Sequence, residues 1–124
     1  NEGPAVVTHA NRLFISYSAS ATDENYCMGL LWIDKDADMT QPANWHKSPQ
    51  PVFTTSYENR QYGPGHNSFT QTPEGEDVLV YHARNYTEIE GDPLYDPNRH
   101  TRLKTVRWKE DGMPDFGIPP ADTL

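Results

Sequence analysis

Two stretches decide the fold: Asn1-Glu2-Gly3-Pro4-Ala5-Val6-Val7-Thr8 and, sixty residues later, Gly63-Pro64-Gly65-His66-Asn67-Ser68-Phe69-Thr70. Each contains a Gly-Pro turn that leads into a pattern typical of a β-strand. A carboxylic acid, Glu2, precedes the first turn, and a histidine, His66, follows the second. The pair indicates a weak internal repeat with the period of one four-stranded β unit.

After each Gly-Pro turn, the chain repeats the same order of predicted strands and turns. Eleven prolines and eight glycines interrupt any long helix, and no convincing amphipathic helix is present. Alternating or wholly apolar runs bounded by turn residues predict strands instead. The predicted strands are Pro4–Thr8, Arg12–Ser18, Tyr26–Ile33, a short edge strand at Val52–Thr54, Asn67–Gln71, Val78–Arg84 and Thr101–Trp108.

A repeated four-stranded antiparallel unit predicts an all-β fold made of β-propeller blades. Residues 1 to about 60 would form one blade, and residues from about 61 to 124 the next blade and a closure segment. A single β-sandwich with two similar halves explains the same pattern, so both architectures stay open. Because propellers need about 4–8 blades, the blade interpretation predicts a fragment that is stable only beside the remainder of its domain.

The charge balance excludes several classes of partner. Lysine and arginine total 10 against 18 acidic residues, a formal net charge of −8. Such a chain lacks the basic surface that nucleic acid or an anionic membrane requires. No stretch approaches the apolar length of a membrane span. Cys27 is the single cysteine, which excludes an internal disulfide framework and a paired-cysteine metal site.

Two residues near the Gly-Pro turns are candidates for chemistry. Glu2 suits a general acid, which must be protonated at working pH and therefore needs a raised pKa. Burial or a neighbouring carboxylate would raise it. Glu2 could equally be a solvated side chain. His66 enters a strand after a tight turn, and no second histidine stands at zinc spacing, so a conventional zinc site is not expected.

A third candidate is Arg84, which shares a strand face with His82 and follows an apolar run that draws it toward the interior. A buried arginine needs either a carboxylate or the hydroxyls of a ligand, and both interpretations are open. The segment Asp92–His100, with two Asp-Pro steps, is either a loop beside a site or a rigid surface crossover.

Taken together, these segments resemble glycoside hydrolase family 43, inverting α-L-arabinofuranosidases and β-xylosidases on a five-bladed β-propeller. The arabinofuranosidase-like branch is the most similar. The resemblance covers nearly the whole chain. It rests on Asn1–Pro4, Phe14–Ser20, Tyr26–Leu30, Tyr62–Phe69, Tyr81–Arg84 and Asp96–Arg102.

The resemblance implies roles for four residues. Glu2 matches the general acid that protonates the leaving glycosidic oxygen. Arg84 and Tyr26 match substrate-binding positions. His66 matches a histidine of the central channel, which in many relatives reaches a calcium-type ion, largely through waters. One imidazole is an unusual ligand for an oxygen-preferring cation, so the ion is an expectation about the channel and not about His66 alone.

The family's two catalytic aspartates, the general base and the residue that orients the acid, precede the glutamate and have no counterpart here. An inverting hydrolase needs two carboxyls about 6.5–9.5 Å apart. The resemblance therefore implies the C-terminal part of a catalytic propeller, roughly its last two blades. It would be active only with the N-terminal remainder, in the same or a separate chain.

The implied function is release of arabinofuranose or xylose from plant cell-wall oligosaccharides or polysaccharides, arabinan and arabinoxylan among them. This substrate class favours a secreted or periplasmic enzyme over a cytoplasmic one. Two other functions stay open, a structural interaction domain and a non-catalytic carbohydrate-binding β-domain. The aromatic platform of the latter would be Trp32, Trp45, Tyr57, Tyr62 and Tyr86.

Overall fold

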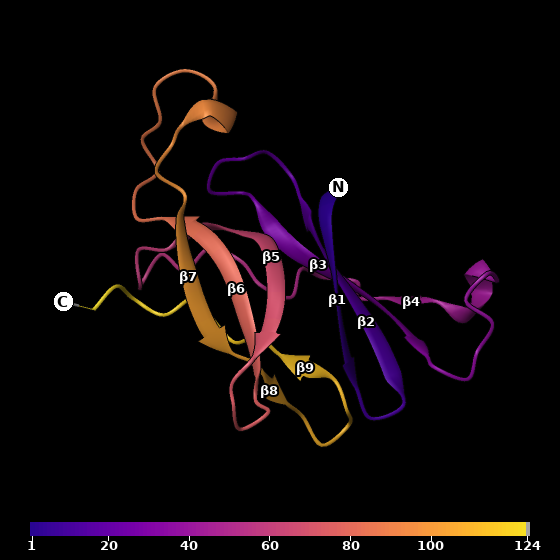
Figure 1. The fold of residues 1–124 in the computed structure, drawn as a ribbon. Coiled ribbons are helices and arrows are strands. Elements are labelled where there is room, and N and C mark those ends of the chain that lie inside the picture. Colours follow the sequence, from indigo (N-terminus) through magenta and orange to yellow (C-terminus); the bar gives the residue numbers. More distant parts are fainter. Residues whose placement is uncertain (124) are drawn as a thin grey trace.

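The computed structural model describes residues 1–123, which form antiparallel sheets joined by loops. The first sheet has four strands in the order β1-β2-β3-β4 (Figure 1). They span Glu2–His9, Arg12–Ala19, Cys27–Asp34 and His46–Lys47. The all-β antiparallel fold is confirmed.

The second sheet has three strands, β5 (Tyr62–Gln71), β6 (Asp77–Arg84) and β7 (His100–Thr105). The expectation of a single strand from Thr101 to Trp108 is wrong. β7 stops at Thr105, and the buried Val106 donates its backbone N–H to the carbonyl of Asp77.

After Val106 the chain leaves the sheet. β8 (Arg107–Trp108) and β9 (Pro114–Asp115) form a separate hairpin. Trp108 of this hairpin stacks on His9 of the first sheet, with ring centroids 4.1 Å apart. The first sheet therefore has the four strands expected of a blade, whereas the second has three strands in the described part of the chain.

The predicted edge strand at Val52–Thr54 is also wrong. Phe53 makes one isolated bridge to Met28, and the edge position of the first sheet belongs to β4. Pro49 and Pro51 lack the backbone N–H that a continuous ladder needs. Two single-turn 3₁₀ helices, Pro42–Asn44 and Pro93–Tyr95, complete the described elements. None of the helices in residues 1–123 is long and apolar enough to cross a membrane.

The two sheets pack on one another through β5, which lies against the first three strands. The alternation predicted for β2 is present, and the buried face is the one that carries Phe14, Ser16 and Ser18. The side chains of Leu13, Ile15 and Tyr17 lie on the other, half-buried face. Phe14 joins a core that also contains Met28, Leu30, Phe53, Leu79, Tyr81, Ala83 and Phe116.

The buried serines connect the sheets by hydrogen bonds. The Ser16 hydroxyl donates to the side-chain oxygen of Asn67 at 2.9 Å. The backbone N–H of His66 donates to the Ser18 hydroxyl at 2.7 Å. Small hydroxyl side chains let the backbones of β2 and β5 approach closely while these polar groups stay paired. This contact fixes the position of β5 relative to the start of β1.

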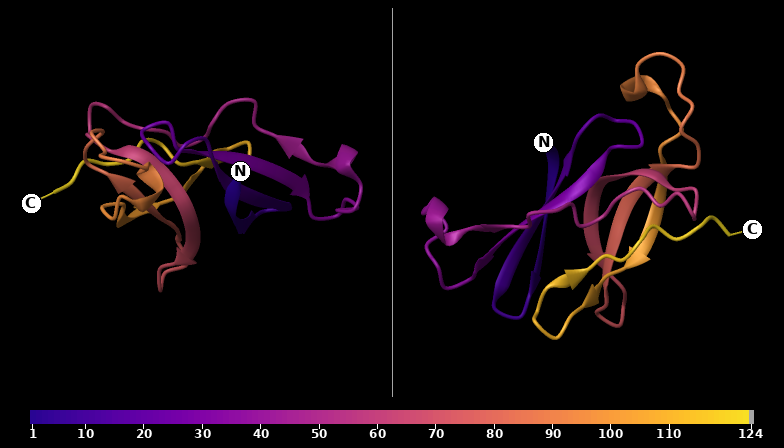
Figure 2. Two further views of the ribbon diagram at one scale, coloured as in Figure 1. Left: turned by 90° about the horizontal axis from the view of Figure 1, so that it is seen from above. Right: turned by 180° about the vertical axis from the view of Figure 1, so that it is seen from behind.

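One end of the molecule gathers the segments that carry the candidate residues. The N-terminus, the loop between β2 and β3, and the long loop between β6 and β7 all lie at the same end (Figures 1 and 2). The turn between β1 and β2 and the β8–β9 hairpin lie at the opposite end (Figure 1). The candidate site is therefore built from loops and strand ends, supported by the two sheets.

Candidate active site

Glu2 begins β1 at an irregular point of the sheet. It pairs with Ser18, and the register then shifts before Ala5. Gly3 has a φ of +58°, a conformation that glycine adopts without the strain of a side chain. A Cβ at this position would also lie 3.3 Å from the ring of His66. Gly3 therefore allows Glu2 and His66 to lie next to each other, with the Glu2 side chain 51% exposed.

Tyr26 binds Glu2 directly. Its hydroxyl donates a hydrogen bond to Oε1 of Glu2. The residue is only 2% exposed. Burial, followed by the hydrogen bond to Glu2, raises the pKa of Tyr26 to about 12. The hydroxyl therefore stays protonated and available as a donor at any physiological pH.

His66 also approaches the carboxyl, with its Nδ1 3.5 Å from Oε1 of Glu2. Its backbone adopts a φ of +45°, and the hydrogen bond from its N–H to Ser18 holds it there. The imidazole is half exposed. Tyr26 and His66 thus contact the same oxygen of Glu2, one from within the fold and one from its surface.

The electrostatics of Glu2 within this chain are opposite to the expectation. The Tyr26 hydrogen bond lowers the pKa of Glu2, and the charges of His66 and Arg99 lower it further. No carboxylate is among the groups in residues 1–123 that shift it. A raised pKa, which a general acid needs at neutral pH, is not produced by these residues.

Two residues near Glu2 were not singled out as site residues from the sequence. His82 stacks on Tyr26, with centroids 5.8 Å apart and planes 10° from parallel. Burial and the charge of Arg99 lower the pKa of His82 to about 4, so its imidazole is neutral. The positive charge of Arg99, on the β6–β7 loop, acts on both Glu2 and His82. The weak signal for both was their membership of the segments Tyr81–Arg84 and Asp96–Arg102.

Arg84 lies in the interior, as its position after an apolar run predicted, and is 2% exposed. Its Nε donates to Oδ1 of Asp96 at 3.0 Å. Its terminal nitrogens donate to the carbonyls of Thr22 at 2.5 Å and Pro93 at 2.6 Å. These contacts fit the interpretation in which a carboxylate pairs with Arg84, because each guanidinium nitrogen already donates within the fold.

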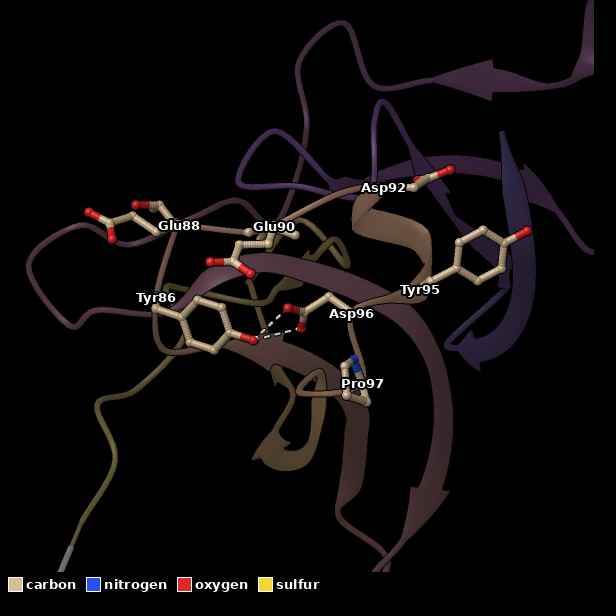
Figure 3. A pocket seen from close by; sticks show the side chains of 9 residues that line it. Tyr86, Glu88, Glu90, Asp92, Tyr95, Asp96 and Pro97 are labelled. Carbon is tan, nitrogen blue, oxygen red and sulfur yellow. Dashed lines mark hydrogen bonds between the residues drawn. The ribbon is translucent and has the colours of Figure 1, made fainter.

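Asp96 connects Arg84 to a pocket in the β6–β7 loop. The Tyr86 hydroxyl bonds both carboxylate oxygens of Asp96, at 2.6 and 2.8 Å, and points toward them in Figure 3. The Tyr86 bond lowers the pKa of Asp96. The pocket is also lined by Glu88, Glu90 and Asp92. The bonds of Asp96 to Arg84 and Tyr86 hold the conformation of the β6–β7 loop. This loop is therefore an ordered segment next to the site.

The described residues near His66 offer few ligands for the expected calcium-type ion. Residues 1–123 contain no group of three or more histidine, cysteine, aspartate or glutamate side chains arranged to hold a metal. A hard cation takes 6–8 oxygen ligands, and the carboxylate nearest His66 already accepts from Tyr26. These residues do not form such a site, and an ion near His66 would depend on waters or on ligands from elsewhere in the enzyme.

The family model described as glycosyl hydrolases family 43 matches residues 1–114. The chain belongs to this family. The resemblance of the sequence is thereby confirmed, and family membership supports the propeller interpretation over the sandwich. The number of blades stays a prediction.

Family 43 relatives cover the chain at high identity. An extracellular exo-α-(1→5)-L-arabinofuranosidase from Streptomyces avermitilis is 60% identical over 98% of this chain and 26% of the relative. α-L-Arabinofuranosidase 43 from Humicola insolens is 56% identical over the same shares. The crystal structure of an α-L-arabinofuranosidase from Lactobacillus brevis superposes with a TM-score of 0.95, at 56% identity, over the whole chain and 39% of the neighbour. The chain thus spans about a quarter of the curated relatives.

Proposed function

We propose that the enzyme containing this chain is an inverting α-L-arabinofuranosidase in which Glu2 is the general acid. The observation that carries the proposal is the contact of Tyr26 and His66 with one oxygen of Glu2 in a family 43 chain. The names of the relatives favour arabinofuranose over xylose as the released sugar. The carbohydrate-binding alternative has less support, since only Tyr57 and Tyr62 of its five aromatics pair with each other in the described residues, and they meet edge to face.

In the proposed reaction Glu2 gives its proton to the glycosidic oxygen as the bond to the sugar breaks. A water activated by a second carboxylate attacks the opposite face of the sugar, which inverts the anomeric carbon. The second carboxylate would belong to the part of the enzyme outside these 124 residues. The same part would supply the carboxylate that raises the pKa of Glu2, because the net effect of the residues described here is to lower it, although burial alone raises it.

The partner of this segment is therefore the remainder of the catalytic domain, in the same or a separate chain. A surface suited to it lies on the half-buried face of β2 and β3. Ile15, Leu31, Met39 and Trp45 line an apolar depression there.

We place the enzyme outside the cell, because its substrates are polymers and the Streptomyces relatives are named extracellular. A channel ion bound through waters near His66 belongs to the same proposal.

The test compares leaving groups in the full-length enzyme. Glu2→Gln should lower kcat/KM by at least about 10²-fold on an arabino-oligosaccharide and far less on an aryl α-L-arabinofuranoside with an acidic phenol, which leaves with little protonation. Proton NMR of the first product should show the inverted anomer. Equal losses on the two substrates, or greater activity on the matching aryl β-D-xyloside, would contradict the proposal. Metal analysis of wild type and His66→Asn tests the ion separately.

A further inference from the structure

The ring of Tyr26 is buried between the turn that contains Gly65 and the imidazole of His82. A Cβ on Gly65 would lie 2.5 Å from Cε2 of Tyr26 and 3.0 Å from the Ser18 hydroxyl. His82 covers the ring in a parallel stack. A Cβ on Gly63 would lie 3.4 Å from Cβ of Tyr26. These neighbours hold the ring where its hydroxyl donates to Glu2.

Besides forming a turn, the segment Gly63-Pro64-Gly65-His66 positions two side chains at Glu2. The space left by the missing side chain of Gly65 is filled by the ring of Tyr26. Directly after it, His66 approaches the same oxygen of Glu2. The segment thus places one aromatic hydroxyl and one imidazole at the carboxyl group.

We propose that Tyr26 is a positioning residue for the general acid, which orients Glu2 through its hydroxyl and does not bind the sugar. The proposal deepens the function proposed above and depends on it. It departs from the substrate-binding role that the family resemblance implied for Tyr26. The buried ring and the use of its hydroxyl by Glu2 leave little surface for a ligand within these residues.

The physical consequence concerns the acid as it loses its proton. A hydrogen bond from a neutral hydroxyl to the forming carboxylate favours the charged state, so it makes Glu2 a stronger acid toward the glycosidic oxygen. The other side chains that act on Glu2 here are His66 and Arg99, and both also lower its pKa. Tyr26 is the largest of these influences and the one that also fixes the direction of the carboxyl group.

The decisive experiment uses Tyr26→Phe in the full-length enzyme, with Tyr81→Phe as the matched control. Tyr81 is equally buried, and its hydroxyl has no hydrogen-bond partner among the described residues. Tyr26→Phe should lower kcat/KM on substrates with poor leaving groups by about 10- to 100-fold, the range for losing a hydrogen bond to a charged group. The basic limb of its pH profile should move to higher pH, because the acid holds its proton longer.

The control variant should leave the basic limb and the leaving-group dependence unchanged. Tyr26→Phe with an unmoved limb and equal losses on good and poor leaving groups would overturn the positioning role. If Glu2→Gln retains its leaving-group effect in the same series, the proposed function stands while this inference fails. Gly65→Ala provides a second variant, since it displaces the ring and keeps the hydroxyl. It should reproduce the preferential loss on poor leaving groups, and an unchanged enzyme would contradict the inference.

Discussion

His66 Nδ1 lies 3.5 Å from Oε1 of Glu2, the same oxygen that accepts the hydrogen bond of the Tyr26 hydroxyl. The histidine was expected from the sequence as a lining residue of a central channel. Its contact with the candidate acid gives it a direct influence on proton transfer. The backbone of His66 has a φ of +45°, a region that asparagine tolerates better than most residues. His66→Asn is therefore the substitution that tests this influence with the least strain.

We expect His66→Asn in the full-length enzyme to move the basic limb of the kcat/KM profile to higher pH. The imidazole lowers the pKa of Glu2, so its loss lets the acid keep its proton to a higher pH. The movement should be smaller than that of Tyr26→Phe, because the Tyr26 hydrogen bond is the larger cause. His46→Asn, on the exposed strand β4, serves as the control. A limb that moves to lower pH would contradict this sign.

Gly63→Ala should destabilise the enzyme far more than Gly75→Ala. Both glycines have positive φ, +64° and +86°, so each substitution carries about 1 kcal/mol of backbone strain. A Cβ at Gly63 would additionally lie 2.3 Å from the carbonyl oxygen of Asp23, whereas nothing lies within 4 Å at Gly75. We expect a further loss of about 2 kcal/mol or more at Gly63, measured by thermal or urea unfolding. Equal losses would show that the Asp23 contact relaxes freely.

Arg84→Lys should lower the free energy of unfolding by about 2–4 kcal/mol, since one ammonium cannot replace three separate donor contacts and leaves buried acceptors unpaired. Faster proteolysis within the β6–β7 loop should accompany the loss, because Arg84 holds Asp96 and the carbonyl of Pro93. Arg107→Lys, on an exposed position of β8, is the control and should have little effect. If Arg84→Lys instead leaves stability unchanged and raises KM alone, Arg84 acts on the substrate.

His82 should make the enzyme less stable in mild acid. Its pKa is lowered from the ordinary 6.5 to about 4, so between these values the unfolded chain binds a proton that the folded chain excludes. The free energy of unfolding therefore falls as the pH drops from 6.5 to 4, and this contribution is absent above pH 6.5. After allowance for solvent screening at a half-buried site, the effect is about 1–2 kcal/mol.

The measurement is a comparison of unfolding at pH 7.5 and pH 4.5. His82→Gln should lose about 1–2 kcal/mol less than the wild type over this interval, because glutamine does not titrate. His46→Gln should behave like the wild type. A His82→Gln variant with the same acid sensitivity as the wild type would assign the loss of stability to other groups.

The strands were largely predictable from local pattern. Alternation in Arg12–Ser18 and turn residues around Val78–Arg84 placed β2 and β6 within one or two residues of their bounds. The prediction from local pattern failed where contacts between distant residues set the ends of a strand. The strand beginning at Thr101 ends early because the chain after Val106 enters the β8–β9 hairpin, whose Trp108 stacks on His9, and the edge strand moved to β4. Neither contact leaves a trace in the nearby sequence.

In the candidate site, too, local sequence predicts some features and tertiary contacts determine the others. The residues Glu2, Tyr26 and His66 were identified from their segments, because Gly-Pro turns and family-like motifs are local features. What each one touches depends on how β1, β3 and β5 meet, and residues 24 to 64 positions apart become neighbours only after the sheets pack. The direction of the Glu2 pKa and the burial of Arg84 are set by those neighbours. Chemical capacity thus belongs to the residue types, while proximity, burial and charge environment belong to the folded sheets.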